Sequence, residues 1–542
     1  MSGVGRARRG ERLAVLVLSD ETYPRHRGGS GKCSHLLAAG LAARGHVVHL
    51  LSLTEDGGRR EQIDGVEVHR VEPPAHRSSI DATETAIAGH LLDYVRREIR
   101  PSELDLVHDS CGFMSYFFPL EHELKRRYGL PLVVHFRYLL LRHQMVSEPR
   151  RTFDPFAPRV LGLEACIAES TQCFPVRIAD LVLSPSRQDA ALIEELYRPA
   201  PGTLRVIADP VRLAPPDPIR SGLTRSRIAR PGESLVLFGG RIHSDLKGAD
   251  VVLDAFRRVV RQRRGVRLLV ASSDETTAAT FTRRLGDAVT FLGWIRDDAE
   301  MAAVLRAVDL VVMPSRYESF GLMCAEAMAA GTPVIASPVG GLRDMIADGH
   351  DGVLLGGGTA SEWGPELAAR ILELVADPAR RLRMGERARI RAARELDLAT
   401  LSERLEGLYR DLLAAGRHTA GGQAVRAPSL TPGDRELYLS LLGEHGGPAA
   451  RAAGGALLDR WALDVESRCV ACRREGIAEH TRTLVRIGRR PPWGRAGAAA
   501  DRRRRVEAAL APACPLALVQ KGRVRRAAEG GGVRAGIEGG AP

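Results

Sequence analysis

Two glutamates with seven residues between them are the strongest candidates for chemistry in this 542-residue sequence. Glu318 lies in a polar segment after a short apolar run, and Glu326 lies in an alanine-rich segment that we expect to be helical. A carboxylate inside an otherwise apolar helix is costly to bury unless it has a partner. A pair of sugar or ribose hydroxyls would be such a partner, so we favour a site for a sugar-containing ligand. The alternative is that Glu318 caps the helix and Glu326 forms a salt bridge.

A glycine-rich segment at residues 239–248 supplies positive charge. It joins an apolar run to an expected helix and contains Gly240, Arg241 and Lys247. Arginine can donate two parallel hydrogen bonds to phosphate oxygens, and lysine adds a compact charge. The segment therefore predicts a diphosphate site, with a solvated surface loop as the alternative.

A shorter glycine segment, residues 28–32, includes Gly28 and Gly29 and lies between the first expected strand and a helix. Glycines allow a phosphate to approach the backbone, and a helix N-terminus attracts anions. The segment is not a Walker A loop, because His26 and Cys33 stand where that motif has glycine and serine or threonine. A tight turn without a ligand explains it equally well.

Cysteines near the C-terminus have a spacing with a faint similarity to a zinc site. Cys469 and Cys472 form a close pair, and His480 and Cys514 follow. A structural zinc site usually takes four ligands with regular spacing. Because no second pair is present, we predict no metal site from the sequence.

Short apolar runs alternate with amphipathic segments, which predicts βαβ units and parallel sheets. The pattern fills the first 210 residues and restarts after a proline-rich segment at 209–218. The expected strands are residues 13–18, 47–53, 104–108, 132–136, 181–183 and 204–207, then 235–238, 266–271, 289–292, 310–313 and 334–336. The expected helices are residues 34–44, 190–196, 249–262, 298–307, 322–330 and 362–376, with a long helical stretch over 378–415.

This pattern predicts an α/β protein of two Rossmann-like, doubly wound parallel-sheet domains that face a cleft, the natural place for a ligand. We expect an N-terminal domain at residues 1–210, a C-terminal domain at 219–395, and a helix at 396–420 that packs back toward the first domain. Residues 421–542 are rich in alanine, glycine and arginine. We expect helices at 434–442 and 456–465 there and otherwise disorder, because few large apolar residues are available to bury.

Composition excludes several classes of protein. No apolar run approaches the roughly 18–20 residues that span a bilayer, and the N-terminus lacks the features of a secretory signal, so we expect a cytoplasmic protein. The eight cysteines are scattered, which excludes a disulfide-rich framework. Most of the net charge of +12 lies in the tail, whose arginines lack interleaved aromatic residues for base stacking. We therefore expect no nucleic-acid partner and leave open a peripheral contact of the tail with the inner membrane leaflet.

The motifs together resemble a known family. Glu318 and Glu326 match the E-x7-E motif of retaining GT-B glycosyltransferases of the family 4 or group 1 type. The flanking Ser-Phe-Gly-Leu and Gly-Thr-Pro-Val-Ile-Ala segments, the Gly-Gly-Arg…Lys-Gly segment, the N-terminal glycine segment and Phe-Leu-Gly-Trp-Ile at 291–295 are also similar to that family. The resemblance covers residues 12–415.

The resemblance implies transfer of a sugar from a nucleoside diphosphate sugar, of the UDP or GDP type, to a small-molecule or lipid hydroxyl acceptor. It also implies retention of anomeric configuration, no metal and no tightly bound cofactor, with the donor in the second domain and the acceptor in the first. Arg241 and Lys247 would neutralise the diphosphate, Glu326 would bind the ribose, and Gly29 would let the first domain close on the donor. The implied donor-binding residues are Gly28, Gly29, Gly240, Arg241, Lys247, Trp294, Ile295, Glu318, Phe320, Gly321, Leu322 and Glu326. The candidate catalytic residues are Glu318, His135, Arg137, Arg241 and Lys247.

Two departures from the family concern the first domain. Where the family often has a histidine near the sugar and acceptor, alignment on Pro131 gives Arg137, with His135 two residues earlier. Residues two apart on a strand share a face, so either side chain could reach the cleft. The Asn-Gly that is usual near the linker is Asp209-Pro210 here.

A basic cluster in the first domain joins His135 and Arg137 to Arg142 and His143. It either holds an acidic or phosphorylated acceptor or forms a solvated helix face. Two other functions stay open, a GT-B sugar-nucleotide epimerase and a catalytically weak scaffold whose arginine-rich tail binds nucleic acid or membrane. The glutamate pair together with the two cations of residues 239–248 argues against the epimerase.

Overall fold

The computed structural model describes residues 12–21, 28–54, 57–74, 87, 89–112, 117–139, 175–176, 178–197, 199–213, 215, 217–240, 245–356 and 362–415. Arg241 therefore lies outside the described residues, as do Arg142, His143, the cysteine pair at 469 and 472, and both expected helices of the tail. Within the described ranges, no helix is long and apolar enough to cross a membrane.

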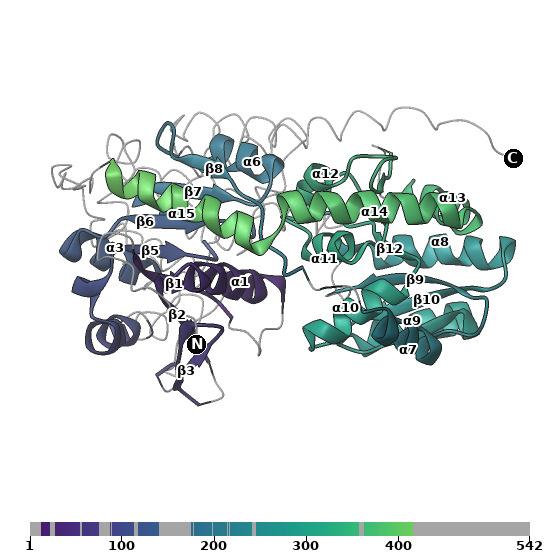
Figure 1. Cartoon of the computed structure of the whole chain (residues 1–542), viewed down its shortest axis with the longest axis horizontal. Helices are drawn as coiled ribbons and strands as arrows, with labels where there is room; N and C mark the ends of the chain where they lie inside the picture. The colour runs from purple at the N-terminus through teal and green to yellow at the C-terminus, as the bar shows by residue number, and fades with distance from the viewer. Residues whose placement is uncertain are drawn as a thin grey trace, which may run out of the picture.

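An eight-stranded sheet forms the core of the N-terminal domain (Figure 1). Its strand order is β3-β4-β2-β1-β5-β6-β7-β8, and every neighbouring pair is parallel except β3 with β4. The strands are β1 (Ala14–Leu18), β2 (Val47–Leu53), β3 (Arg59–Ile63), β4 (Val66–Val71), β5 (Leu106–Asp109), β6 (Leu132–His135), β7 (Leu181–Ser184) and β8 (Leu204–Val206). The helices are α1 (Gly29–Ala43), η1 (Val95–Ile99), η2 (Pro101–Glu103), α3 (Phe117–Tyr128) and α6 (Arg187–Tyr197).

The edge hairpin of β3 and β4 is absent from the strands expected from the sequence. Its turn residues are Asp64, with a φ of 51°, and Gly65, with a φ of 78°. Two successive residues with positive φ form the two-residue turn whose twist suits a hairpin, and Asp-Gly is a preferred sequence for it. The Asp-Gly pair was therefore a usable signal for these two strands.

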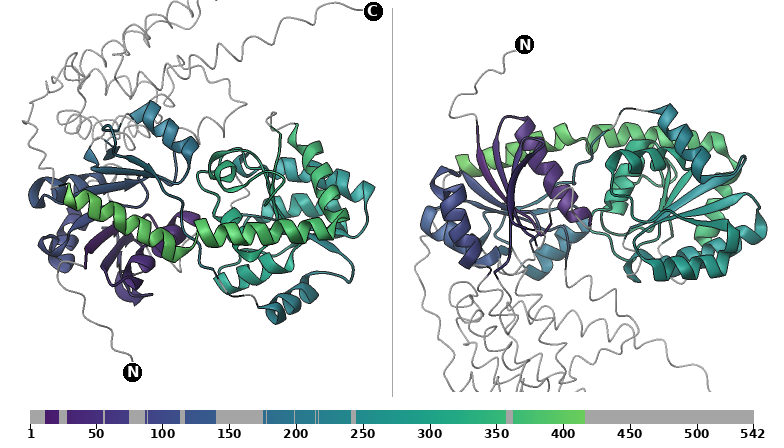
Figure 2. Two further views of the ribbon diagram at one scale, coloured as in Figure 1. Left: turned by 45° about the horizontal axis from the view of Figure 1, so that its top comes forward. Right: turned by 90° about the horizontal axis from the view of Figure 1, so that it is seen from below.

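A six-stranded, all-parallel sheet forms the core of the C-terminal domain, in the order β11-β10-β9-β12-β13-β14. Strands β10 and β12 are buried at every position, as expected where helices cover both faces of a parallel sheet (Figure 2). The strands are β9 (Ser234–Gly239), β10 (Val266–Ala271), β11 (Val289–Phe291), β12 (Leu310–Met313), β13 (Val334–Ala336) and β14 (Val353–Leu354). The helices are α7 (Pro218–Ile228), η3 (Asp245–Lys247), α8 (Ala249–Gln262), α9 (Glu275–Leu285), η4 (Gly286–Ala288), α10 (Asp298–Ala307), α11 (Leu322–Ala330), α12 (Gly340–Met345), α13 (Trp363–Ala376) and α14 (Pro378–Glu395). The expected α/β architecture of two doubly wound parallel sheets is confirmed.

In each sheet the strand order reverses at the first strand. Strand β1 has β2 on one side and β5 on the other, and β9 has β10 and β12. At such a point the loops that follow the strands diverge and leave a crevice at the carboxyl ends. Residues after β1, β9 and β12 line one common cavity, so the crevices of the two domains face each other.

Two chain segments run side by side between the domains. The Val211 N–H donates to the Leu396 carbonyl (2.9 Å), and the Leu398 N–H donates to the Val211 carbonyl (3.2 Å). The expected long helical stretch is in fact two helices, α14 and α15 (Leu398–Ala414). Asp397 has an extended backbone between them, and its carboxylate caps α15 by accepting two backbone hydrogen bonds. Helix α15 then packs against α1 of the first domain (Figure 1).

Glu406 of α15 contacts residues of the first domain. Its carboxylate forms ion pairs with Arg44, His46 and Arg410. Burial raises the pKa of Glu406, but the hydrogen bonds from these partners outweigh burial and lower the pKa to about 2.

We expect Glu406→Gln to lower the Tm at neutral pH. A carboxylate whose pKa falls on folding stabilises the fold above its unfolded pKa of about 4.3, and this contribution is lost as the pH falls toward 2. The Tm difference from the wild type should therefore shrink as the pH falls below about 4. Glu403→Gln, at an exposed position of the same helix, is the control. A Tm difference for Glu406→Gln that does not change between neutral and acidic pH would contradict the assignment.

Candidate active site

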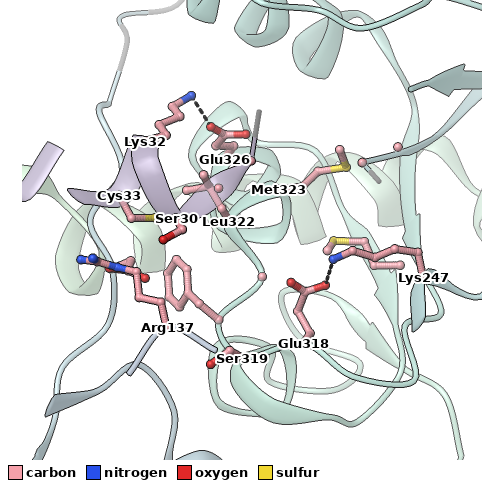
Figure 3. A pocket seen from close by; sticks show the side chains of 18 of the residues that line it. Ser30, Lys32, Cys33, Arg137, Lys247, Glu318, Ser319, Leu322, Met323 and Glu326 are labelled. Carbon is pink, nitrogen blue, oxygen red and sulfur yellow. Dashed lines mark hydrogen bonds and ion pairs between the residues drawn. The ribbon is translucent and has the colours of Figure 1, made fainter. Parts of the chain in front are cut away.

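A cavity of about 750 Å³ lies between the two domains. First-domain residues after β1 and at the start of α1 line one side, and residues after β9 and β12 and at the start of α11 line the other. Figure 3 shows side chains from both domains around this space. The volume is within the range of small-molecule and cofactor sites, roughly 300–1,000 Å³.

The loop between β12 and α11 brings Glu318 to the cavity. Its neighbours Tyr317 and Ser319 donate hydroxyl hydrogen bonds of 3.2 and 2.5 Å to Asp189 in α6 of the first domain. Glu318 instead forms an ion pair with Lys247 of η3, with 2.5 Å between Oε2 and Nζ (Figure 3). The flanking hydroxyls thus tie the loop to the first domain while Glu318 faces the second.

Gly321 determines how α11 begins. Its φ is 98°, a conformation that L side chains rarely adopt. A Cβ atom here would also lie 2.7 Å from Leu342 Cδ2. Glycine therefore permits the tight turn that brings the first residues of α11, with their free backbone amides, to the cavity wall.

The N-terminus of α1 lies opposite that of α11. A Cβ atom on Gly29 would lie 3.6 Å from Leu322 Cδ2, so the first residues of the two helices are in close proximity. The N-terminal end of a helix carries partial positive charge and attracts anions. Two such ends meet at this cavity, which makes it suited to a phosphorylated ligand.

Glu326 forms an ion pair across the domain interface. Lys32 Nζ in α1 lies 2.6 Å from Glu326 Oε1 and 2.7 Å from Asp298 Oδ1 in α10 (Figure 3). Burial raises the pKa of Glu326, and the charge of Lys32 offsets part of that effect. Burial also disfavours the charge of Lys32, but the two carboxylates outweigh it and raise the pKa of the ammonium. Glu326 therefore has the salt bridge that the sequence left as an alternative.

Arg137 lines the cavity, and its guanidinium group makes several buried hydrogen bonds. Its Nε donates to Asp209 (2.7 Å), and its Nη1 donates to the Ser34 hydroxyl (3.0 Å) and the Ser110 carbonyl (2.5 Å). Its Nη2 is buried without a hydrogen-bond partner among the residues that the structure describes. The two departures from the family, Arg137 and Asp209, are therefore partners in one ion pair.

His135 lies in the core rather than in the cavity wall. Its ring is fully buried and stacks on His108 with 5.6 Å between ring centroids. Burial, and then the charge of Arg137, hold the pKa of His135 well below its ordinary value. Strand β6 ends at His135, so strand alternation does not extend to residue 137. The expectation that either side chain could reach the cavity is therefore corrected, since Arg137 lines it and His135 does not.

Comparison with known proteins identifies the family. Residues 233–377 match the family described as glycosyl transferases group 1, and residues 28–209 match the glycosyl transferase 4-like domain. The D-inositol 3-phosphate glycosyltransferase of Segniliparus rotundus is 30% identical over 437 residues, which cover 74% of this chain and 90% of the relative. The protein of the same name from Stackebrandtia nassauensis is 30% identical over 435 residues, covering 75% and 93%. The chain belongs to the group 1 glycosyltransferases.

Solved structures agree with the GT-B fold of this glycosyltransferase. Sucrose-phosphate synthase from Thermosynechococcus elongatus aligns with a TM-score of 0.60 at 24% identity, over 75% of this chain and all of the other. Anabaena HepE in complex with UDP-glucose aligns with a TM-score of 0.57 at 18% identity, over 74% of this chain and all of the other. At these identities the likeness concerns the fold alone. The family resemblance drawn from the motifs is confirmed by the family models and the curated relatives.

Most of the site residues that the sequence predicts line the cavity between the two domains of this glycosyltransferase. Two are not placed there, because His135 is in the core and Arg241 is outside the described residues. The expected residues in the cavity lining are Gly28, Gly29, Arg137, Gly240, Lys247, Trp294, Ile295, Glu318, Phe320, Gly321, Leu322 and Glu326. Their roles toward a ligand stay predictions.

Several charged residues of the lining were not among the site residues expected from the sequence: Asp20, Glu21, Lys32, Asp209, Arg296 and Asp298. Lys32 ends the glycine segment 28–32, and its place at the start of a helix was a signal of anion or carboxylate binding. Asp20 follows β1 closely, at the carboxyl end where doubly wound sheets bind ligands. Asp298 begins α10, and no feature of the sequence marks it.

We expect Gly321→Ala to abolish most glycosyltransferase activity and to lower the Tm. The positive φ alone costs on the order of 1–3 kcal/mol, and the new methyl group must displace Leu342. Gly349→Ala is the matched control, because Gly349 has a φ of 73° and no atom within 4 Å of an added Cβ. It should lose stability but keep its activity per folded molecule. If the two variants retain equal activity, the start of α11 is not part of the active site.

Proposed function

We propose that the protein transfers a sugar from a nucleoside diphosphate sugar to a hydroxyl group of a phosphorylated acceptor, without a metal in the transfer step. The observation that carries the proposal is the convergence of Lys247, Glu318, Glu326 and two helix N-termini on one cavity. Retention of the anomeric configuration follows from the resemblance to the E-x7-E motif. NMR of the product's anomeric centre tests it.

Each part of such a donor has a counterpart in the cavity. Glu326 can accept hydrogen bonds from the two ribose hydroxyls, and Trp294 and Ile295 offer a wall for the base. Lys247 and the amides at the start of α11 can bind the diphosphate. Glu318, beside Lys247, can accept hydrogen bonds from the donor sugar. We favour UDP or GDP as the nucleotide, and the solved HepE complex contains UDP-glucose.

The ion pair of Lys247 with Glu318 suggests how the charge of the leaving group is managed. An incoming diphosphate competes with Glu318 for the ammonium, so Glu318 becomes free to bind sugar hydroxyls. As the glycosidic bond breaks, negative charge grows on the diphosphate, and Lys247 then stabilises the transition state more than the ground state. Arg241 stays a proposed second cation.

Arg137 is the proposed contact for the acceptor. Arg137 lines the cavity, and its Nη2 is a buried donor without a partner among the described residues. Leaving such a donor unsatisfied costs about 1–3 kcal/mol. A phosphate oxygen of the acceptor would satisfy it. The curated relatives are named for a phosphorylated inositol, which agrees with an acceptor of this class.

We expect one nucleoside diphosphate among UDP, GDP, ADP and TDP to raise the Tm of the wild type. Lys247→Met and Glu326→Ala should each lose that response, because they remove the diphosphate and ribose contacts. Arg258→Met and Glu373→Ala, which alter ion pairs on exposed helix surfaces, are the matched controls and should keep it. If both active-site variants respond like the wild type, the donor site is assigned wrongly.

The acceptor role of Arg137 is tested by Arg137→His combined with Asp209→Asn. This pair removes both charges together, whereas Arg137→His alone leaves a buried carboxylate unpaired at a cost of about 3–5 kcal/mol. We expect the double variant to bind the donor nucleotide normally and to show a KM for a phosphorylated acceptor raised about tenfold or more. An unchanged acceptor KM, or a loss confined to donor binding, would contradict the proposal.

Of the two other functions considered from the sequence, the epimerase is disfavoured and the scaffold stays untested. The family and its curated relatives are glycosyltransferases, which argues for transfer over epimerisation. A scaffold role would depend on the arginine-rich tail, which lies outside the described residues. Contact of that tail with a membrane surface stays a proposal.

A further inference from the structure

We propose that His49, Glu67 and His69 form a binding site for a divalent transition-metal ion, zinc above all, in the N-terminal domain. The three residues lie in strands β2 and β4 near the edge of the eight-stranded sheet. None of them lines the cavity between the domains. The proposed site is therefore separate from the transfer chemistry.

The register of the sheet brings the three side chains to one face. His49 of β2 is the parallel partner of Glu67 in β4, and His69 lies two residues beyond Glu67 on the same strand. Alternate residues of a strand project to the same side. One ligand atom from each residue can be chosen so that all three lie within 4.8 Å of one another.

The spacing of these atoms is close to that of a tetrahedral zinc site. His49 Nδ1 lies 2.9 Å from Glu67 Oε2 and 3.1 Å from His69 Nε2. Zinc bonds to nitrogen and oxygen of about 2.0–2.1 Å place the ligand atoms of a tetrahedron about 3.3 Å apart. Small outward movements of the side chains would therefore admit the ion. Two imidazoles and one carboxylate leave a fourth position for water.

Neighbouring side chains orient the proposed ligands. The Tyr94 hydroxyl lies 3.0 Å from His69 Nδ1, so that Nε2 faces the cluster. Arg60 binds Oε1 of Glu67, with 2.6 Å from Nε, which leaves Oε2 toward His49. Contacts of this kind fix the tautomer and direction of metal ligands.

Within the part of the chain that the structure describes, the facing atoms of His49, Glu67 and His69 lack a group that can bond to all three, because Arg60 pairs with the other oxygen of Glu67. A proton on His49 Nδ1 faces two acceptors, Glu67 Oε2 and His69 Nε2, and cannot bond well to both. A metal ion would satisfy all three atoms at once. The side chains of His49 and Glu67 are 12% and 26% exposed, so an ion can enter from solvent. A bound ion would link β2 to β4, the inner strand of the edge hairpin.

The test uses the full chain carrying Cys469→Ser and Cys472→Ser, so that the cysteine pair of the tail contributes no zinc. Zinc binding is measured by calorimetry and by metal analysis after dialysis, and cobalt is added separately to record the visible absorption of a tetrahedral site. In this background we compare His49→Gln, Glu67→Gln and His69→Gln. His350→Gln, at a histidine with a 61% exposed side chain, is the matched control.

We expect one zinc ion per chain in the background and in the control. Loss of a side chain that merely contacts a metal ligand weakens metal binding by roughly 10–100-fold. Each of the three variants removes a ligand itself, so it should weaken zinc binding by at least this factor. Each should also lose the visible absorption of tetrahedral cobalt. Circular dichroism shows whether each variant folds. If His69→Gln does not fold, the partly exposed His49 and Glu67 variants decide the result. The proposal is overturned if the background binds no zinc, or if the folded variants bind it as tightly as the control.

Discussion

The ion pair between Lys32 and Glu326 links the two domains at the cavity, where α1 of the first domain and α11 of the second both begin. Glu326 lies in α11, whose other residues are small or apolar and largely buried. A carboxylate in such a helix would be costly to desolvate alone. Lys32 compensates part of that cost from the opposite domain. The same ion pair holds the carboxylate of Glu326 at the cavity wall, where we propose that it binds the ribose of the donor.

Other contacts between the domains maintain this arrangement. Tyr317 and Ser319 hold the Glu318 loop against Asp189, and the two connecting segments are hydrogen-bonded to each other through Val211. Domain opening that moved α1 away from α11 would separate Lys32 from Glu326. The relative position of the domains therefore depends on a few charged and hydroxyl groups that lie at or beside the cavity.

The sequence predicted the elements that depend on local patterns and failed where distant contacts decide. Apolar runs predicted most of the parallel strands, because buried parallel strands are apolar on both faces. The edge strand β3 and its neighbour β4 contain charged residues and lacked that pattern. The motifs gave Glu318, Glu326 and Lys247, whose types and spacing reflect ligand chemistry. They did not give Lys32 as the partner of Glu326, 294 residues away. Nor did they show that His135 is fully buried, which depends on the position of β6 between β5 and β7 in the sheet.

A comparison of two ligands tests directly our proposal that Glu326 binds the ribose of the donor. Calorimetry would give the affinity of the wild type and of Glu326→Ala for the preferred nucleoside diphosphate and for its 2′,3′-dideoxy analogue. Hydrogen bonds to a charged group contribute about 1.5–3 kcal/mol, so loss of the hydroxyls should weaken wild-type binding by roughly 10–100-fold. In Glu326→Ala the two ligands should bind almost equally. An equal loss in both proteins would show that the ribose hydroxyls are bound elsewhere and would contradict the account.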